Sequence, residues 1–176
     1  HEDPAVSLVE SYEGLYVLTE KIKRDTNRVN IASLSLEDTT EPAITGGYLL
    51  EIMKPDRLDA DEVGLPLAGD FVASLVYPSP DKITDVQQAW IQNYLAQFET
   101  ALFGANFTDS DLGYRRFINE ESFIDYMILQ EYFKNRDAFH SSTFFYKDRD
   151  DLIHMGPIWD LNIAMGYFSF AGHQET

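Results

Sequence analysis

Two aspartates in the last third of the sequence stand where carboxylates can take part in chemistry. Asp137 follows a long apolar run, and Asp160 follows the apolar pair Ile158-Trp159. The residues between them have the pattern of a β-hairpin, with a strand over Thr143–Lys147, an acidic turn and a short strand that ends at Met155. A hairpin in this place folds the two aspartates back toward each other, so the sequence predicts that their carboxylates share one cleft.

The settings of the two aspartates predict different roles. Asp160 lies among apolar residues, where a carboxylate needs either a structural cation or a metal ion as its partner. Asn162 adds an amide oxygen in the same turn, and hard cations prefer oxygen ligands. Asp137 lies in a loop, where it is either a general base or an ordinary turn former. Protein kinases hold their catalytic base and their Mg²⁺ ligand in this arrangement, on a loop and a strand end separated by a hairpin.

Three segments in the first half of the chain have strand patterns. Gly14–Ile22 alternates between its two sides, which predicts a strand with one buried face. Tyr48–Met53 follows a Gly-Gly pair, and Phe71–Tyr77 ends at a proline, so both predict further strands. The segment Asp56–Gly69 between them follows Pro55 and contains Pro66 and two glycines, which predicts a loop.

Two helices are predicted in the second half of the chain. The first begins at a capping box formed by Thr84 and Gln87 and ends at Gly104. Its stripe of aromatic residues is interpreted as core packing. The second runs from about Asn119 to Lys134 and is apolar on nearly every side, which predicts a helix buried centrally in the domain that positions Asp137. Strands first and helices second indicate an α+β fold in two layers, arranged as two lobes.

Four cations lie close together behind Glu20, in a chain that is otherwise acidic. They are Lys21, Lys23, Arg24 and Arg28. One interpretation is an internal Glu20–Lys21 ion pair followed by cations that face phosphate groups; the other is a solvated strand end and helix face. A strongly acidic protein must concentrate positive charge where it binds phosphate, so we expect at least one of these cations to face the cleft of Asp160.

Composition excludes several classes of function. The formal net charge is −17 and the isoelectric point is near 4.3, which argues against broad binding of nucleic acids and favours basic protein partners. No apolar run is long enough to span a membrane. The chain has no cysteine, which excludes disulfides, thiolate zinc sites and a cysteine nucleophile. It begins with His1 rather than Met, and we expect it to be a piece of a longer chain.

Five blocks of sequence, in order, resemble the CotH (spore coat protein H) kinase family. They are Tyr12–Ile22, which contains the pattern G-x-Y-x-L-x-E; Gly46–Ile52, a GGY-x-L-x-I strand; Phe123–Tyr126 with Lys134–Ala138; Ser142–Asp148; and Gly156–Asp160. The resemblance covers about Tyr12 to Gly166. It implies a kinase-like α+β domain over residues 1–176, truncated at both ends, with a strand-rich part (1–80) and a helical part (81–176) that carries Asp137 and Asp160.

The resemblance also implies a reaction and its residues. Members of the family use ATP and Mg²⁺ to phosphorylate serines on proteins, among them spore-coat proteins. By resemblance Asp137 is the catalytic aspartate and Asp160 binds the metal, with Asn162 and Ser142 as further ligands. Asn162 stands where the family often has a second aspartate, and Ser142 where it often has an asparagine. Glu20, Lys21, Lys23 and Arg24 are then the expected contacts to the nucleotide.

Two other functions are compatible with the sequence. One is a non-catalytic module for assembly of a spore coat or cell surface, which keeps the fold without the chemistry. The other is an extracellular glycan-active domain, which requires two carboxylates about 5 to 10 Å apart beside a sugar-binding cleft. The leading expectation is an extracytoplasmic kinase, at the cell surface or spore coat, that acts on a protein substrate which is itself basic and rich in serine.

Overall fold

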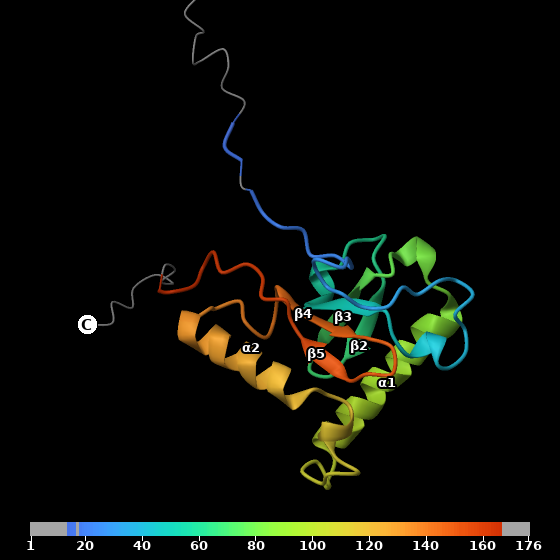
Figure 1. Ribbon diagram of the computed structural model, residues 1–176. Coiled ribbons are helices and arrows are strands. Elements are labelled where there is room, and N and C mark those ends of the chain that lie inside the picture. Colours follow the sequence, from blue (N-terminus) through green and yellow to red (C-terminus); the bar gives the residue numbers. More distant parts are fainter. Residues whose placement is uncertain (1–13, 17, 167–176) are drawn as a thin grey trace, which may run out of the picture.

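A single antiparallel sheet forms the centre of the protein. The computed structural model describes residues 14–16 and 18–166. Its five strands lie in the order β2-β3-β1-β4-β5 (Figure 1). They are β1 (Tyr48–Met53), β2 (Gly64–Leu67), β3 (Phe71–Tyr77), β4 (Thr143–Lys147) and β5 (Ile153–Met155). The two α-helices are α1 (Asp85–Phe103) and α2 (Glu120–Phe133), and the 3₁₀ turns are η1 (Ala43–Thr45), η2 (Pro55–Arg57), η3 (Pro80–Lys82) and η4 (Tyr114–Arg116). The predicted α+β class is confirmed.

The central strand β1 joins the two halves of the chain. It pairs with β3 on one side and with β4 on the other, so that Glu51 lies opposite both Ser74 and Phe144. Most residues of β1 are buried on both faces of the sheet, which explains why every residue of the strand except Glu51 is apolar. Leu50 packs into the main core below α1, whereas Leu49 packs against Val29 and Ile31 on the opposite face. Strands from both ends of the chain therefore belong to one sheet.

The aromatic stripe of α1 packs against the sheet as predicted. Trp90 stacks on Tyr48 of β1, with ring centroids 6.0 Å apart, and on Tyr94, at 5.4 Å. Ile91 and Leu95 on the same helix are buried in the core. The start of the helix is also confirmed: the Thr84 hydroxyl accepts a hydrogen bond from the Gln87 amide, and the Gln87 side chain accepts one from the Thr84 amide. None of the described helices is long and apolar enough to span a membrane.

Lys147, at the end of β4, is a buried charged residue with 2% of its surface exposed. Its Nζ donates hydrogen bonds to the carbonyls of Thr45 (2.7 Å) and Asp148 (2.9 Å), and it lies over the Trp90 and Tyr94 rings. Burial lowers the pKa of the ammonium group, because desolvation disfavours the charged form. The two carbonyls and the ring faces offset part of that cost. Lys147 therefore fastens the end of β4 to η1 and α1.

Two predictions about strands are wrong. Gly14–Ile22 forms no strand in its described residues, and Val17 lies outside them. An alternating sequence indicates which side of a strand is buried, but it does not specify the strand with which it pairs. The nearby backbone pairing is a single isolated bridge between Arg24 and Val29. The segment Asp56–Gly69, predicted to be a loop, contains β2 and the last two residues of η2. Its Pro66 is tolerated because β2 is an edge strand, where the missing N–H donor faces no neighbour.

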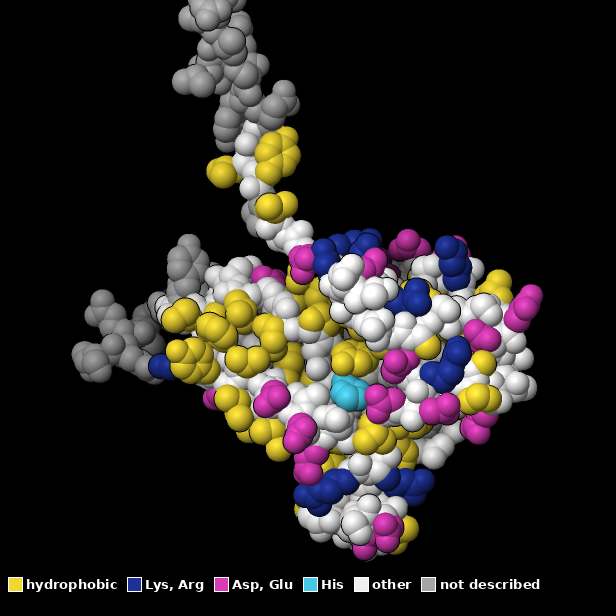
Figure 2. Space-filling model, in the orientation of Figure 1, with side chains coloured by type: hydrophobic (Ala, Val, Ile, Leu, Met, Phe, Trp, Pro, Cys, Tyr) yellow, Lys and Arg dark blue, Asp and Glu magenta, His cyan; other side chains and the backbone are white. Residues whose placement is uncertain are grey.

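The prediction that the helix before Asp137 is buried centrally is also wrong. Helix α2 packs one side against β5 and buries Tyr126 and Gln130. Its other side is exposed in the described part of the protein. The apolar residues on it are Ile124, Met127, Ile128, Leu129 and Tyr132, between 41% and 75% exposed. Figure 2 shows a broad apolar surface over this helix. The sheet ends at β5, so no described layer covers the outer side of α2.

The capping box generates a test of stability. Replacement Thr84→Ala removes the side-chain acceptor from the first turn of α1, and we expect it to lower the free energy of unfolding by about 1 kcal/mol. Thr84→Ser keeps the hydroxyl and is the matched control, expected to remain close to the wild type. Urea denaturation followed by circular dichroism measures both. Equal loss of stability in the two variants would show that the hydroxyl does not stabilise the helix.

Candidate functional site

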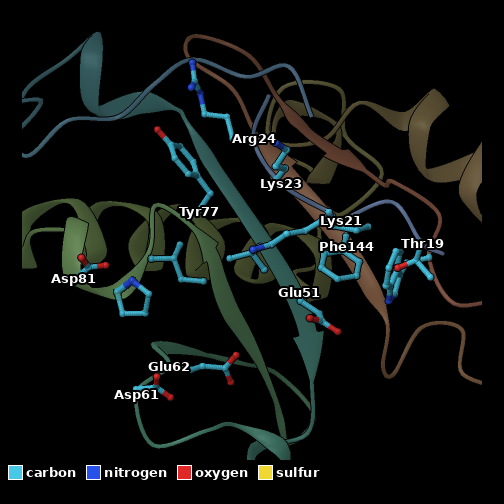
Figure 3. A pocket seen from close by; sticks show the side chains of 15 residues that line it. Thr19, Lys21, Lys23, Arg24, Glu51, Asp61, Glu62, Tyr77, Asp81 and Phe144 are labelled. Atoms are coloured by element: carbon cyan, nitrogen blue, oxygen red, sulfur yellow. The ribbon is translucent and has the colours of Figure 1, made fainter. Parts of the chain in front are cut away.

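A pocket with a volume of about 930 Å³ opens on the face of the sheet beside β1 and β3 (Figure 3). It combines cations, carboxylates and aromatic rings. Its lining residues are Thr19, Lys21, Ile22, Lys23, Arg24, Glu51, Asp61, Glu62, Leu75, Val76, Tyr77, Pro80, Asp81, Phe144 and Trp159. This volume lies in the range of pockets that hold small organic ligands. We call this pocket the sheet-face pocket.

Three of the cations predicted from the sequence line the sheet-face pocket. Figure 3 shows Lys21, Lys23 and Arg24 on one side of it, with Glu51 and Glu62 on the other. The Arg24 Nε donates to the Ile31 carbonyl at 2.9 Å, and its guanidinium lies 5.6 Å from the centre of the Tyr77 ring. Lys23 forms an ion pair with Asp25 at 3.5 Å. Within the described residues Lys21 forms no ion pair, so its charge is available to a ligand.

Of the two interpretations of the cation cluster, the internal Glu20–Lys21 ion pair does not form among the described residues. Glu20 instead pairs with Arg28, at 2.6 Å between carboxylate and guanidinium. The segment that follows Glu20 turns back on itself, as the Arg24–Val29 bridge shows, and this turn brings Arg28 beside the carboxylate. Glu20, Lys21 and Arg28 line a smaller pocket of about 250 Å³, together with Trp159. The fourth predicted cation therefore neutralises Glu20 at the margin of the site.

Trp159 connects both pockets to Asp160. Its ring packs edge-on against Phe144 of β4, with centroids 6.5 Å apart, and both rings line the sheet-face pocket. Asp160 is the next residue in the chain and is half-buried. The expectation that at least one of the cations faces the cleft of Asp160 is consistent with this placement, because Lys21, Lys23 and Arg24 share the pocket with the residue directly before Asp160.

The loop that carries Asp137 is fixed by hydrogen bonds at the end of α2. The Asn135 side chain donates to the Gln130 side chain at 2.9 Å, and its oxygen accepts from the Asp137 amide at 3.3 Å. The Asp137 carbonyl accepts from the Ser141 amide at 3.2 Å. Thr143, at the start of β4, accepts from the Phe139 amide at 3.2 Å. These contacts set the backbone at Asp137, which is half-buried.

The segment after Asp160 returns to the helix that precedes Asp137. The Met165 amide donates to the Phe133 carbonyl at 2.6 Å, so the two aspartate-bearing segments meet at the C-terminal end of α2. Asp160 itself has φ 55°, and Phe139 and Ser142 have φ 71° and 49°. Left-handed backbone at residues other than glycine is unfavourable and gathers at functional sites. The placement of both carboxylates on one cleft stays a prediction.

The predicted metal ligands comprise one carboxylate and two neutral oxygens. Asp160 and Ser142 are half-buried, and Asn162 is exposed. The described residues contain no group of three histidines, aspartates or glutamates that could hold a metal ion by itself. This donor set fits Mg²⁺, which commonly binds one or two carboxylates and completes its shell with water and substrate phosphates. It does not fit a metal ion that requires an all-protein cage.

Sequence reasoning missed Glu51, the half-buried glutamate on β1 that lines the sheet-face pocket. Burial raises the pKa of its carboxyl group, and the nearby Glu62 carboxylate raises it further. The signal was present in the sequence, since Glu51 interrupts the apolar strand Tyr48–Met53. A carboxylate with a perturbed pKa inside a pocket is a candidate for ligand binding. The loop contacts of Gln130, Asn135 and Thr143 carried no comparable sequence signal.

The raised pKa of Glu51 predicts a pH-dependent stability. Between its usual pKa of 4.5 and its higher pKa in the folded state, the folded protein binds more protons than the unfolded chain, so Glu51 destabilises the fold as pH rises through that range. Glu51→Gln should therefore have a higher melting temperature than wild type at pH 7, and the difference should vanish near pH 4. Glu37→Gln, in an exposed loop, is the control. An unchanged difference across this range would contradict the assignment.

Comparison with known proteins places the chain in a family. No curated protein matches the chain, and no solved structure matches it. The family described as CotH kinase protein matches residues 5–175, which is nearly the whole chain. This match agrees with the resemblance of the five sequence blocks. The chain belongs to the CotH kinase protein family.

Proposed function

We propose that the protein transfers the γ-phosphoryl group of ATP to a serine or threonine of another protein, with Mg²⁺ as cofactor. The observation that carries the proposal is the sheet-face pocket, which groups Lys21, Lys23 and Arg24 with Trp159, the residue directly before Asp160. Family membership supports a kinase-like activity. The nucleotide is assigned to this pocket. Asp137, Asp160, Asn162 and Ser142 are not among the residues that line it, and their roles are assigned from the resemblance to the family.

The sheet-face pocket has the character expected of a nucleotide site. A chain with a net charge of −17 repels a triphosphate except where cations gather. Three cations line one side of this pocket, and the carboxylates of Glu51, Asp61, Glu62 and Asp81 also belong to its lining. Phe144, Trp159 and Tyr77 supply aromatic surface on which a purine can stack. Phosphates beside Lys21 and a base against the rings use both kinds of lining. Glu20 supports this arrangement indirectly, by holding Arg28 at the margin of the site.

Asp160, with Asn162 and Ser142, is the proposed set of protein ligands for Mg²⁺. When bound, this ion neutralises charge that develops on the phosphate oxygens. Asp160 contributes the only carboxylate of the proposed set; it is half-buried, has left-handed backbone and follows Trp159 directly in the chain. Loss of its charge is therefore expected to affect binding of the metal-bound nucleotide rather than the stability of the fold.

Asp137 is the proposed base. The substrate hydroxyl oxygen forms a bond to the γ-phosphorus, the bond from that phosphorus to the β–γ bridging oxygen breaks, and ADP leaves. The hydroxyl proton passes to the Asp137 carboxylate. Such a positioned base contributes about 10² to 10⁴ in rate, and the remaining catalysis comes from positioning and charge neutralisation. The hydrogen bonds of Asn135 and Ser141 hold the backbone of Asp137 for this role.

The proposal also covers the architecture, the location and the partner of the protein. A kinase-like two-lobe architecture is proposed, of which residues 1–176 form an incomplete part with the Asp137/Asp160 site in residues 81–176. The proposed location is extracytoplasmic, at a cell surface or spore coat, and the proposed partner is a basic, serine-rich protein. The acidic surface of the chain suits such a partner. No nucleic acid partner is proposed.

A non-catalytic assembly module of the same family is the second candidate. It is favoured by the sparse metal site, in which neutral Asn162 and Ser142 stand beside a single carboxylate. Such a module would bind its partner without consuming ATP. Mg·ATP binding and phosphotransfer therefore separate the two candidates.

The roles of the two aspartates predict different losses. In a version of the protein that is active, Asp160→Asn should abolish Mg²⁺-supported binding of ATP, because it removes the charged ligand for the metal. Asp137→Asn should retain binding of Mg·ATP and lower turnover by about 10² to 10⁴. Calorimetric titration with Mg·ATP and a phosphotransfer assay measure the two effects. Equal loss of binding in both variants would show that the roles are assigned wrongly, and unchanged activity in both would rule out the kinase mechanism.

The pocket cations generate a separate prediction. Replacement Lys21→Met removes a charge that makes no ion pair within the described residues, and it should weaken binding of Mg·ATP by about tenfold, as expected for loss of one phosphate contact. Arg57→Met removes one charge from an exposed residue outside the pocket and is the matched control. Titration with Mg·ATP at constant ionic strength measures both. Equal weakening would indicate an effect of net charge alone.

A further inference from the structure

An apolar groove runs along the side of α2. Its volume is about 380 Å³, and its lining includes Ile124, Met127 and Phe139, with Glu120 and Glu131 among the lining residues. Ile124 and Met127 belong to the exposed outer side of α2, so the groove is continuous with the apolar surface in Figure 2. Exposed apolar surface of this extent, edged by polar residues, is characteristic of an interaction site. We call the groove and the outer side of α2 together the α2 surface.

Most of the charges around the α2 surface are negative, although Glu120 is paired with Arg115 and Lys134 is exposed directly after the helix. Helix α2 contains no lysine or arginine, and Glu121, Asp125 and Glu131 are exposed on it. A partner that covers the apolar residues must therefore place positive charge opposite these carboxylates. A second copy of the chain would bring the same carboxylates together in a protein with a net charge of −17, so self-association is disfavoured. Charge complementarity favours a basic partner.

The groove ends at the loop that carries the proposed base. Phe139 lies two residues after Asp137, and it lines the groove together with Met127 of α2. Its amide is held by Thr143, which fixes the wall of the groove to the start of β4. A polypeptide in this groove is thereby brought to the loop of Asp137. This position connects the α2 surface to the proposed phosphate transfer.

We propose that the α2 surface docks an amphipathic helix of the acceptor protein, with an apolar face that fills the groove and lysines or arginines along its edges. Such a helix pairs its apolar residues with Ile124 and Met127 and its cations with Asp125 and Glu131. This is the helix-in-groove mode of recognition, in which a few apolar side chains anchor the peptide and the charges set its orientation. The description of the partner as the acceptor depends on the proposed kinase activity; the docking of a basic helix does not.

The chain's own end is the competing occupant. Residues 167–176, outside the described part, contain Tyr167, Phe168 and Phe170, and they follow the Met165–Phe133 hydrogen bond at the end of α2. This segment has no lysine or arginine, and it contains Glu175. It therefore lacks the charge complementarity that the α2 surface requires, and substitutions in it test the alternative directly.

The test uses a synthetic peptide of leucine and lysine, patterned as an amphipathic helix, and the full chain without ATP. We expect the peptide to bind, with an affinity that falls as salt is added, since surface charges are screened. Met127→Asn should weaken binding by about tenfold, because it removes a central apolar contact. Val86→Asn, at an equally exposed apolar residue of α1, should leave it unchanged. Fluorescence anisotropy measures the affinity, and circular dichroism checks that each variant is folded.

Several results would overturn the proposal. A leucine–glutamate peptide of the same pattern that binds equally well would show that charge plays no part, and an unchanged affinity in Met127→Asn would place the peptide elsewhere. A dimer in sedimentation that Met127→Asn dissociates would make a second copy the occupant. Tighter peptide binding in a Phe168→Ser/Phe170→Ser chain would identify residues 167–176 as the occupant.

A second experiment tests the docking surface and the kinase activity independently of each other. With a serine appended to the leucine–lysine peptide, Met127→Asn should raise KM for the peptide and leave kcat unchanged, because Met127 contacts the docked helix and not the reacting atoms. A chain that binds the peptide but transfers no phosphate to any acceptor would refute the proposed function and the acceptor assignment, while the docking surface would stand.

Discussion

The antiparallel pairing of β1 with β4 is the interaction on which the rest of the structure depends. It places Glu51 opposite Phe144, residues from the two halves of the chain, and Phe144 in turn packs against Trp159. Gly46 enters this pairing so close to the hairpin turn that an added Cβ would lie about 2 Å from the backbone of Asp148 and Arg149. A glycine is therefore required there.

Lys147 stabilises the junction of β1 and β4, although burial of an unpartnered ammonium group would be unfavourable. Its buried ammonium group bridges the Thr45 and Asp148 carbonyls, so the start of β1 and the end of β4 are held together beside Trp90. With this junction fixed, the turn that contains Lys21 and Arg24 covers one face of the sheet, while α1 covers the other. The sheet-face pocket forms on the first of these faces, and its lining draws on both ends of the chain.

Much of the fold could be predicted because its signals are local. The α1 capping box, the strands β1 and β3 and the hairpin of β4 and β5 are each encoded within a few residues, and all are confirmed. The wrong predictions concern segments whose packing partners lie far away in the sequence. Alternation in Gly14–Ile22 did not specify a neighbouring strand, and the apolar sequence of α2 did not reveal that its outer side lacks a covering layer in the described protein.

The candidate site was predicted in its chemistry more fully than in its geometry. Residue type and sequence context singled out Asp137, Asp160 and the cation cluster as candidates. The structure brings three of those cations to the pocket beside Trp159, and the roles of the two aspartates stay predictions. Glu51 was overlooked, although a carboxylate inside an apolar strand signals a special environment. The pairing of Glu20 with Arg28 depends on a tight turn that carries no strong sequence pattern.

The two sides of α2 have different surroundings. Its inner side and its C-terminal end hold the Asp137 loop through Gln130 and Asn135, whereas its outer side presents apolar groups and carboxylates to the exterior. Under the proposed function, a protein with a net charge of −17 attracts a triphosphate and a protein substrate by different means. The cations of the sheet-face pocket and the acidic, apolar surface of α2 lie in different places.

The central claim is that the sheet-face pocket binds the nucleotide with its phosphates toward Lys21 and Asp160. A structure of the protein with Mg²⁺ and a non-hydrolysable ATP analogue tests this claim most directly. The account predicts the base against Phe144 and Trp159, the phosphates beside Lys21, Lys23 and Arg24, and the metal ion on the Asp160 carboxylate. An analogue bound in another pocket, or in this pocket with its phosphates turned away from Asp160, would contradict it.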